Sequence, residues 1–258
     1  MTTTRKSTTT KRTRAGESPT GGGRSKSVYQ QLRGLIIRGS LAPGSPIIER
    51  PFAERLGVSR GSLRQALRRL EHEGFVSATA AGVYSRAVVT PLTVADMDDI
   101  YTVIAALNGA GARKAAELPK AERRKMAEGM AAINAELAGA LATPARGSTE
   151  VYDLDHRFHM SYLAVVGGPR LHAFYDAVSS QGERYGRAYS SAVSAVPGVG
   201  GLALASSEEH RAIIDAIRSG DADAAERAAL TNWRNAASRL RLVITSTGER
   251  GGFFGGPD

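Results

Sequence analysis

The sequence predicts a mainly α-helical protein built from two parts. From residue 94 to 246, apolar residues recur with helical spacing, and Pro or Gly residues divide the pattern into six segments without strand-like alternation. Before this region, three shorter helical segments precede two β-prone runs. Charge separates the same two parts, because residues 1–90 hold 16 Lys and Arg against 5 Asp and Glu, whereas residues 91–258 hold 18 against 20. A basic N-terminal part with a polyanionic partner explains this asymmetry.

Composition limits the classes of protein to consider. With 42% apolar and 23% charged residues in 258, the chain has the balance of a soluble globular protein. It has no run of about 18 apolar residues and no apolar segment near its start, so we expect no membrane partner, no secretory signal and a cytoplasmic location. Cysteine is absent, which excludes disulfides and thiolate metal sites and leaves His, Asp, Glu and Asn as plausible metal ligands.

The first predicted elements are short. Residues 1–25 are rich in Thr, Ser, Gly, Lys and Arg and nearly free of apolar side chains, so we expect a disordered basic tail. A helix is predicted over 27–38, where apolar residues recur on one stripe, and a turn containing Gly and Pro ends it. A second helix is predicted over 49–56 and stops at Gly57.

The next helix has two faces of opposite chemistry. Ser59 is predicted to cap its start, because the side-chain oxygen can accept a free backbone N–H of the first turn. The helix continues toward Gly74 with an apolar stripe on one side. The stripe consists of Leu63, Ala66, Leu67 and Leu70, and the opposite face of Gly61, Arg64, Gln65 and Arg68. One face can pack, and the other can contact phosphates and bases.

Two β-prone runs, 75–79 and 84–89, flank a turn that contains Gly82 and predict a hairpin. Three helices followed by a hairpin predict a winged helix-turn-helix, which we place at residues 26–90. Thr93 is predicted to cap the following helix, with Asp96 in its first turn.

The remainder is predicted to be an all-α helical bundle over residues 93–246, followed by a flexible Gly-rich tail over 247–258. Pro or Gly residues mark each division between helices. The predicted helices are 94–118, 120–142, 148–166, 170–192, 206–219 and 222–246.

The N-terminal part carries the motifs of a known family. They are Leu41-Ala42-Pro43-Gly44, Glu49-Arg50, Gly57-Val58-Ser59-Arg60, Leu63-Arg64-Gln65-Ala66-Leu67 and Glu73-Gly74-Phe75. With them, residues 28–90 resemble the GntR family of bacterial transcription regulators. The resemblance implies that Arg50, Arg60 and Arg64 hold DNA and that the hairpin around Gly82 enters the minor groove.

The residue types agree with this role. Arginine is a forked, permanently charged donor suited to guanine O6 and N7 or to phosphate oxygens, and Ser62 can bond a phosphate from the helix N-terminus. The residues predicted to contact DNA are Arg50, Ser59, Arg60, Gly61, Ser62, Arg64, Gln65 and Gly82. Gly61 stands where the family more often has Thr, and Ser62 where Pro is frequent, so base preference could differ. For Arg68 and Arg69 a solvated role stays open.

In the C-terminal part, Asp155 and His159 are four residues apart and would share one helix face, while His210 would come from another helix. The pattern looks like the all-helical ligand-binding domain, abbreviated FCD, of the FadR-like branch of the GntR family. That resemblance implies one divalent metal (Zn, Ni or Mn) per subunit, held by these three residues, with a small carboxylate effector on the metal.

The sequence departs from this pattern at two places. The fourth expected ligand falls on Asn232, whose neutral carbonyl oxygen is a poorer partner for zinc or nickel than imidazole. Many family members carry an Arg and a Glu in the first helix of this domain, where this sequence has Ile104 and Asn108. The effector carboxylate therefore loses one arginine partner, for which Arg184 or Arg187 could substitute. The predicted effector-binding residues are Asn108, Arg184, Arg187 and Asn232.

Several interpretations remain open for the C-terminal part. Asp155, His159 and His210 could instead form a buried polar network or bind an effector directly. A metal-dependent enzyme with an open coordination position is one alternative function, and an effector-independent dimeric DNA-binding protein is another. Because no nucleophile motif or phosphate loop is present, we predict a non-enzymatic, ligand-responsive repressor. It should act as a homodimer on a palindromic operator in double-stranded DNA, at the nucleoid when bound.

Overall fold

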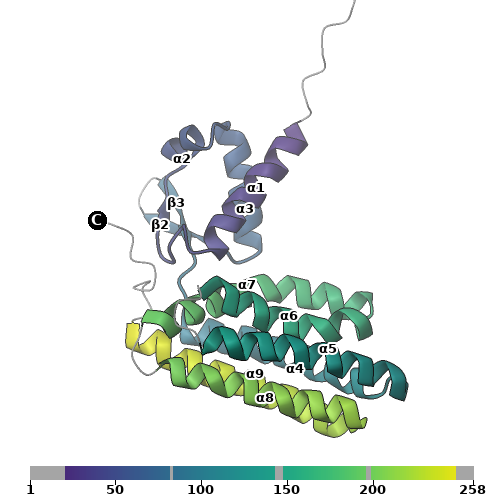
Figure 1. The fold of residues 1–258 in the computed structure, drawn as a ribbon. Helices are drawn as coiled ribbons and strands as arrows, with labels where there is room; N and C mark the ends of the chain where they lie inside the picture. The colour runs from purple at the N-terminus through teal and green to yellow at the C-terminus, as the bar shows by residue number, and fades with distance from the viewer. Residues whose placement is uncertain (1–20, 82–83, 143–147, 196–198, 248–258) are drawn as a thin grey trace, which may run out of the picture.

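The computed structural model describes residues 21–81, 84–142, 148–195 and 199–247, and within these ranges it has nine helices and three strands (Figure 1). The helices are α1 (Gly21–Ile37), α2 (Glu49–Arg55), α3 (Arg60–His72), α4 (Val94–Ala116), α5 (Lys120–Leu141), α6 (Ser148–Val166), α7 (Pro169–Ala195), α8 (Val199–Ser219) and α9 (Ala222–Thr247), and the strands are β1 (Pro46–Ile47), β2 (Val76–Ala81) and β3 (Tyr84–Val89). The first three helices and the sheet form one part, here called the head, and α4–α9 form a helical bundle below it. This arrangement confirms the predicted fold class.

The head is built around one apolar core. Buried side chains of α1 and α3 meet those of the sheet, and they include Val28, Leu32, Ile36, Leu63, Leu70, Phe75 and Val89. The sheet is antiparallel in the order β1-β3-β2, with Val76 opposite Val89 and Ile47 opposite Ala87. The strand β1 was not predicted, because two residues are too few to show an alternating pattern.

The capped helix of the sequence analysis is α3. Ser59 Oγ accepts a hydrogen bond from the Ser62 N–H at 3.1 Å, as predicted for an N-cap. The whole predicted stripe is buried. Gly57 makes the preceding turn with φ +63°, a conformation that strains any residue with a Cβ. The turn, the cap and the stripe together fix α3 against the head and leave its other face exposed.

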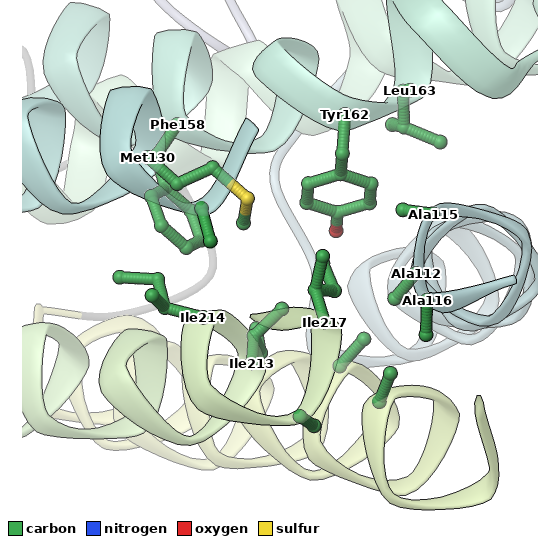
Figure 2. Packing of buried hydrophobic residues seen from close by; sticks show 14 of the residues in the cluster. Ala112, Ala115, Ala116, Met130, Phe158, Tyr162, Leu163, Ile213, Ile214 and Ile217 are labelled. Carbon is green, nitrogen blue, oxygen red and sulfur yellow. The ribbon is translucent and has the colours of Figure 1, made fainter. Parts of the chain in front are cut away.

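Helix α4 is central in the bundle, where it packs along α9 and also contacts α6, α7 and α8. Figure 2 shows the core between these layers, with isoleucines of α8 pointing toward Phe158 and Tyr162 of α6. Small residues bring α4 close to α6, since a Cβ on Gly111 would lie 2.5 Å from Leu163 Cδ2. None of the helices in the described ranges is both long and apolar enough to cross a membrane.

Two predicted helix starts differ from the structure. Helix α1 begins at Gly21 instead of residue 27, and residues 21–26 hold no apolar side chain from which a helical period could be recognised. Helix α8 begins at Val199 instead of 206, so its glycines fall in the first turn, where the backbone N–H groups lack intrahelical partners in any case. Residues 21–25 of the predicted tail 1–25 belong to α1, and Thr247 of the predicted tail 247–258 belongs to α9. The rest of both tails and the hairpin tip with Gly82 lie outside the described residues.

Candidate metal centre and nucleic-acid interface

The structure brings Asp155 and His159 of α6 together with His210 of α8. One potential ligand atom from each lies within 4.8 Å of the others. His210 Nε2 lies 3.6 Å from Asp155 Oδ1, and the two imidazole centroids are 5.1 Å apart with nearly perpendicular rings. Both histidines are buried. The three groups therefore converge on one point, although 55 residues separate the first from the last in sequence.

A buried asparagine sets the tautomer of His210. Asn134 Nδ2 donates to the Ser207 carbonyl at 2.9 Å, and because a carbonyl can only accept, Asn134 Oδ1 must face the imidazole. His210 Nδ1 lies 3.1 Å from that oxygen and must carry the proton. This leaves the His210 Nε2 lone pair free, and Nε2 is buried without a hydrogen-bond partner among the described residues. An orphaned acceptor aimed at a carboxylate fits a metal ligand.

His159 is oriented by a second chain of the same kind. Asn108 Nδ2 donates to the Ile104 carbonyl at 2.9 Å, so Asn108 Oδ1 accepts from the Tyr162 hydroxyl at 2.7 Å. The Tyr162 oxygen, 3.2 Å from His159 Nδ1, must then accept a proton from the ring. His159 Nε2 is thereby also left as the acceptor. Asn108 is wholly buried and reaches His159 through Tyr162, so it orients this imidazole, where we predicted that Asn108 itself contacts an effector.

The charges of the cluster match a divalent cation. Burial lowers the pKa of His210 to about 3, and the Arg239 charge acts in the same direction. Burial likewise holds the pKa of His159 well below its ordinary value, with a smaller contribution from His210. Both imidazoles are therefore neutral at pH 7, which is the form that binds metals. Two neutral imidazoles and one carboxylate form a donor set that suits zinc and related ions.

Asn232, which stands at the family's fourth-ligand position and was predicted to contact the effector, is hydrogen-bonded to a residue outside the cluster. Asn232 Nδ2 donates to Glu209 Oε2 at 2.9 Å, and Arg239 forms two bonds of 2.7 and 3.1 Å with the same carboxylate. Asn232 is thus engaged in a neighbouring ion-pair network and does not line the cavity described next. Asp155 feels this network, because burial raises the pKa of its carboxyl to about 6 while Arg239 opposes the rise.

A cavity of about 80 Å³ adjoins Asp155 and His159. Aromatic side chains form part of its walls, namely Tyr101, Tyr152, Tyr175, Tyr189 and Trp233, beside aliphatic and small residues. Among the described residues that line it there is no Lys and no Arg. The cavity therefore offers hydroxyl groups and ring faces around the candidate metal centre, and no fixed cation.

The structure places the two arginines predicted to clamp the effector carboxylate, Arg184 and Arg187, away from the cavity. Arg187 pairs with Glu183 at 2.7 Å and Asp153 at 3.0 Å, and its guanidinium lies over the Tyr152 ring at 4.7 Å. Arg184 is buried and donates to the Thr90 carbonyl at the base of the head. Neither side chain lines the cavity. The prediction failed here because the sequence does not show which face of α7 points toward the cavity.

The predicted nucleic-acid interface lies on the exposed side of α3 and the start of α2. Arg60, Gly61 and Gln65 are exposed, as is Ser59, and Ser62 is half-buried. Arg64 Nε pairs with Glu49 at 2.7 Å, and Arg50 pairs with Glu54 at 3.1 Å, both on the surface. Exposed pairs of this kind contribute little free energy, so a phosphate or base edge can replace the carboxylate.

In the metal-free protein, Asp155 should make stability fall as pH rises. Its pKa of about 6 exceeds the ordinary 3.8, so the folded state retains the proton and this contribution to stability is lost between about pH 4 and pH 6. In chelator, Asp155→Asn should gain about 1–2 kcal/mol relative to wild type over that range, after a discount for partial exposure. Thermal unfolding at each pH measures the difference, with Asp153→Asn on the same helix as control. A gap that is constant, or that widens toward low pH, would contradict the raised pKa.

Two family models match the chain. The model described as bacterial regulatory proteins, gntR family, matches residues 24–81, and the FCD domain model matches residues 99–235. The galactonate operon transcriptional repressor of Escherichia coli (strain K12) is 28% identical over 229 residues, which cover 81% of this chain and 93% of the repressor. The uncharacterized HTH-type transcriptional regulator YdhC of Bacillus subtilis (strain 168) is 39% identical over 75 residues, covering 29% of this chain and 32% of that protein.

Solved structures share the fold over most of their length. McbR/YncC of E. coli superposes with a TM-score of 0.62 at 17% identity, covering 85% of this chain and 97% of that chain. A GntR transcriptional regulator from Rhodococcus sp. RHA1 also has a TM-score of 0.62, at 20% identity, covering 84% of this chain and 97% of that chain. At these sequence identities, the similarity shows a shared fold and nothing further.

Proposed function

The chain belongs to the GntR family of bacterial regulatory proteins and carries an FCD domain, and on that premise we propose that it is a sequence-specific transcription repressor controlled by a small effector. The observation that carries the proposal is the exposed face of α3, with Arg60, Arg64 and Gln65 opposite a fully buried apolar stripe. A helix held rigidly by one face can place the other in a major groove, where Arg and Gln discriminate between base edges.

The repressor acts as a homodimer in this proposal. A single head covers too little DNA for high specificity, and two-fold symmetric helix-turn-helix proteins solve this by binding two half-sites about 34 Å apart. The operator is therefore expected to be an inverted repeat. Its half-sites should be centred about one helical turn, or a multiple of one turn, apart.

The candidate metal centre belongs to the sensing part of this proposal. Asp155, His159 and His210 would hold one zinc, nickel or manganese ion, and their fit is supported by the unpartnered Nε2 acceptor of His210 and by the two neutral imidazoles. When bound, the ion supplies positive charge and an open coordination position for an effector oxygen. Hydrogen bonds of His210 to Asn134, and of His159 through Tyr162 to Asn108, hold the two imidazole rings in the orientation that metal binding needs.

The effector is a compact monocarboxylate. Since no Lys or Arg is found among the described residues lining the cavity, a divalent ion balanced by Asp155 leaves one positive charge, which one carboxylate neutralises. A dicarboxylate would bury a second negative charge without a partner, at a large desolvation cost. The aromatic walls suit an apolar or ring-shaped body. An effector of this kind could change operator affinity by a coupling of about 1–3 kcal/mol.

Selection from random DNA tests the proposal. Full-length protein, loaded with zinc, is incubated with duplexes containing a randomised segment, and bound duplexes are amplified over several rounds. We expect enrichment of an inverted repeat that binds far more tightly than the starting pool, with a steep dependence on salt. A bound pool that remains random in sequence would contradict specific operator binding.

A further inference from the structure

Helix α7 lies at the upper surface of the bundle, next to the head (Figure 1). Some of its residues line the cavity, among them Gly182, Gly186 and Tyr189, while others contact the head. We propose that α7 transmits occupancy of the cavity to the recognition helix α3 through a latch formed by Gln181 and Arg184. The inference rests on the proposed function for its biological meaning, although the latch itself can be tested without an operator.

Gln181 holds the C-terminal end of α3. Its Nε2 donates to the Glu73 carbonyl at 2.7 Å. Glu73 is the C-cap of α3, where helix carbonyls lack intrahelical partners. The next residue, Gly74, turns the chain with φ +78°, and a Cβ there would lie 3.4 Å from Gln181 Nε2. A side chain of the bundle thus completes the end of the helix that faces DNA.

Arg184 ties the same point to the connection between head and bundle. Its Nη1 donates to Gln181 Oε1 at 3.0 Å, which fixes the amide orientation of Gln181, and its Nη2 donates to the Thr90 carbonyl. The guanidinium is buried near the Phe75 ring, and no described carboxylate forms an ion pair with it. Among the described residues, the buried Arg184 charge is held only by neutral oxygens, and few alternative acceptors are at hand if these hydrogen bonds break. A displacement of α7 therefore readily separates Arg184 from the Thr90 carbonyl.

At two positions the cavity side of α7 is bare backbone, because Gly182 and Gly186 have no side chain that could absorb a displacement. A Cβ on Gly182 would lie 2.6 Å from Ile104 Cδ1, and one on Gly186 would lie 2.5 Å from Tyr152 Cε2. Ile104 and Tyr152 both line the cavity. An occupant that moves either of them therefore pushes directly on the backbone of α7, next to Gln181 and Arg184.

Distance measurements between head and bundle test the latch. The chain has no cysteine, so Glu71→Cys and Glu128→Cys, both at exposed positions, accept a single pair of spin labels. Labelled chains are diluted with unlabelled protein so that each measured distance lies within one chain. We expect one narrow distance distribution for the otherwise unchanged protein, and loss of that narrow distribution in Gln181→Leu and in Arg184→Met. Arg170→Met, which removes an exposed arginine near the start of α7, is the matched control.

A second pair of variants imitates an occupant. Gly182→Ala inserts a methyl group against Ile104 and should shift the head-to-bundle distance, whereas Gly129→Ala, on a helix where a Cβ meets nothing within 4 Å, should not. Latch variants or Gly182→Ala with distributions identical to their controls would overturn the inference. Operator binding is measured separately on the unlabelled protein. Absence of a selected operator contradicts the proposed function alone, because the distance results do not depend on DNA.

Discussion

Arg64→Ala is expected to lower operator affinity by roughly ten- to a hundredfold, because one bidentate arginine contact to a base pair contributes about 1–3 kcal/mol of discrimination. Arg64 lies on the exposed face of α3, and its only ion-pair partner among the described residues is the surface carboxylate of Glu49. Removing the side chain therefore leaves the core of the head intact. Fluorescence anisotropy with the selected operator and a scrambled duplex measures the loss of discrimination, and thermal unfolding checks the fold.

The matched control for this variant is Arg218→Ala. Arg218 is an exposed residue of α8 that pairs with Asp215, so its removal also costs one positive charge and one surface ion pair. The control separates a local contact from the general effect of net charge. If Arg64→Ala still distinguishes operator from scrambled DNA as well as Arg218→Ala does, α3 is not the helix that recognises the bases.

Divalent metal is expected to raise the melting temperature of chelator-treated protein, and Asp155→Asn is expected to lose most of this response. At a thousandfold excess over its Kd, a ligand that binds only the folded state adds about 4 kcal/mol. For a chain of this size that corresponds to a rise on the order of 10 °C. Elemental analysis of the protein before chelation identifies the ion, and differential scanning calorimetry with zinc, nickel or manganese measures the shift.

Asp153→Asn provides the control for the metal response, since Asp153 lies on the same helix but pairs with Arg187 away from the cavity. Equal metal responses in the two variants would exclude Asp155 as a ligand. In the same assay, a 2-hydroxy monocarboxylate should raise the melting temperature of metal-loaded protein further. The dicarboxylate with the same carbon skeleton should do so less. The reverse order would contradict the charge balance on which the proposed effector class rests.

Local patterns in the sequence were sufficient to predict most of the head and the start of the first helix of the bundle. The Ser59 cap, the buried stripe and the Thr93 cap, whose Oγ1 accepts from the Asp96 N–H at 3.2 Å, all depend on residues within a few positions of one another. The strand β1 and the start of α8 escaped prediction. A two-residue strand is defined by its partner strand, and a glycine in the first helical turn resembles a glycine in a loop.

The candidate metal centre was only partly predictable. The spacing of Asp155 and His159 indicated a shared helix face, and the family resemblance implied His210 as their partner; the structure places the three side chains together. Asn134 was missed because its partner His210 is 76 residues away and no short motif connects them. Arg184 was predicted to bind the effector because the sequence shows its charge, but the sequence does not show that its side chain points toward Thr90. Metal binding, dimer formation and the absence of enzymatic activity remain predictions.

The aromatic wall of the cavity has a practical consequence. Trp233 is the single tryptophan of the chain, and its ring centroid lies 4.7 Å from that of His159. All indole emission therefore originates beside the candidate metal centre. Filling the site changes the surroundings of that one fluorophore, so titrations can be followed optically on the unmodified protein, without labels and at low concentration.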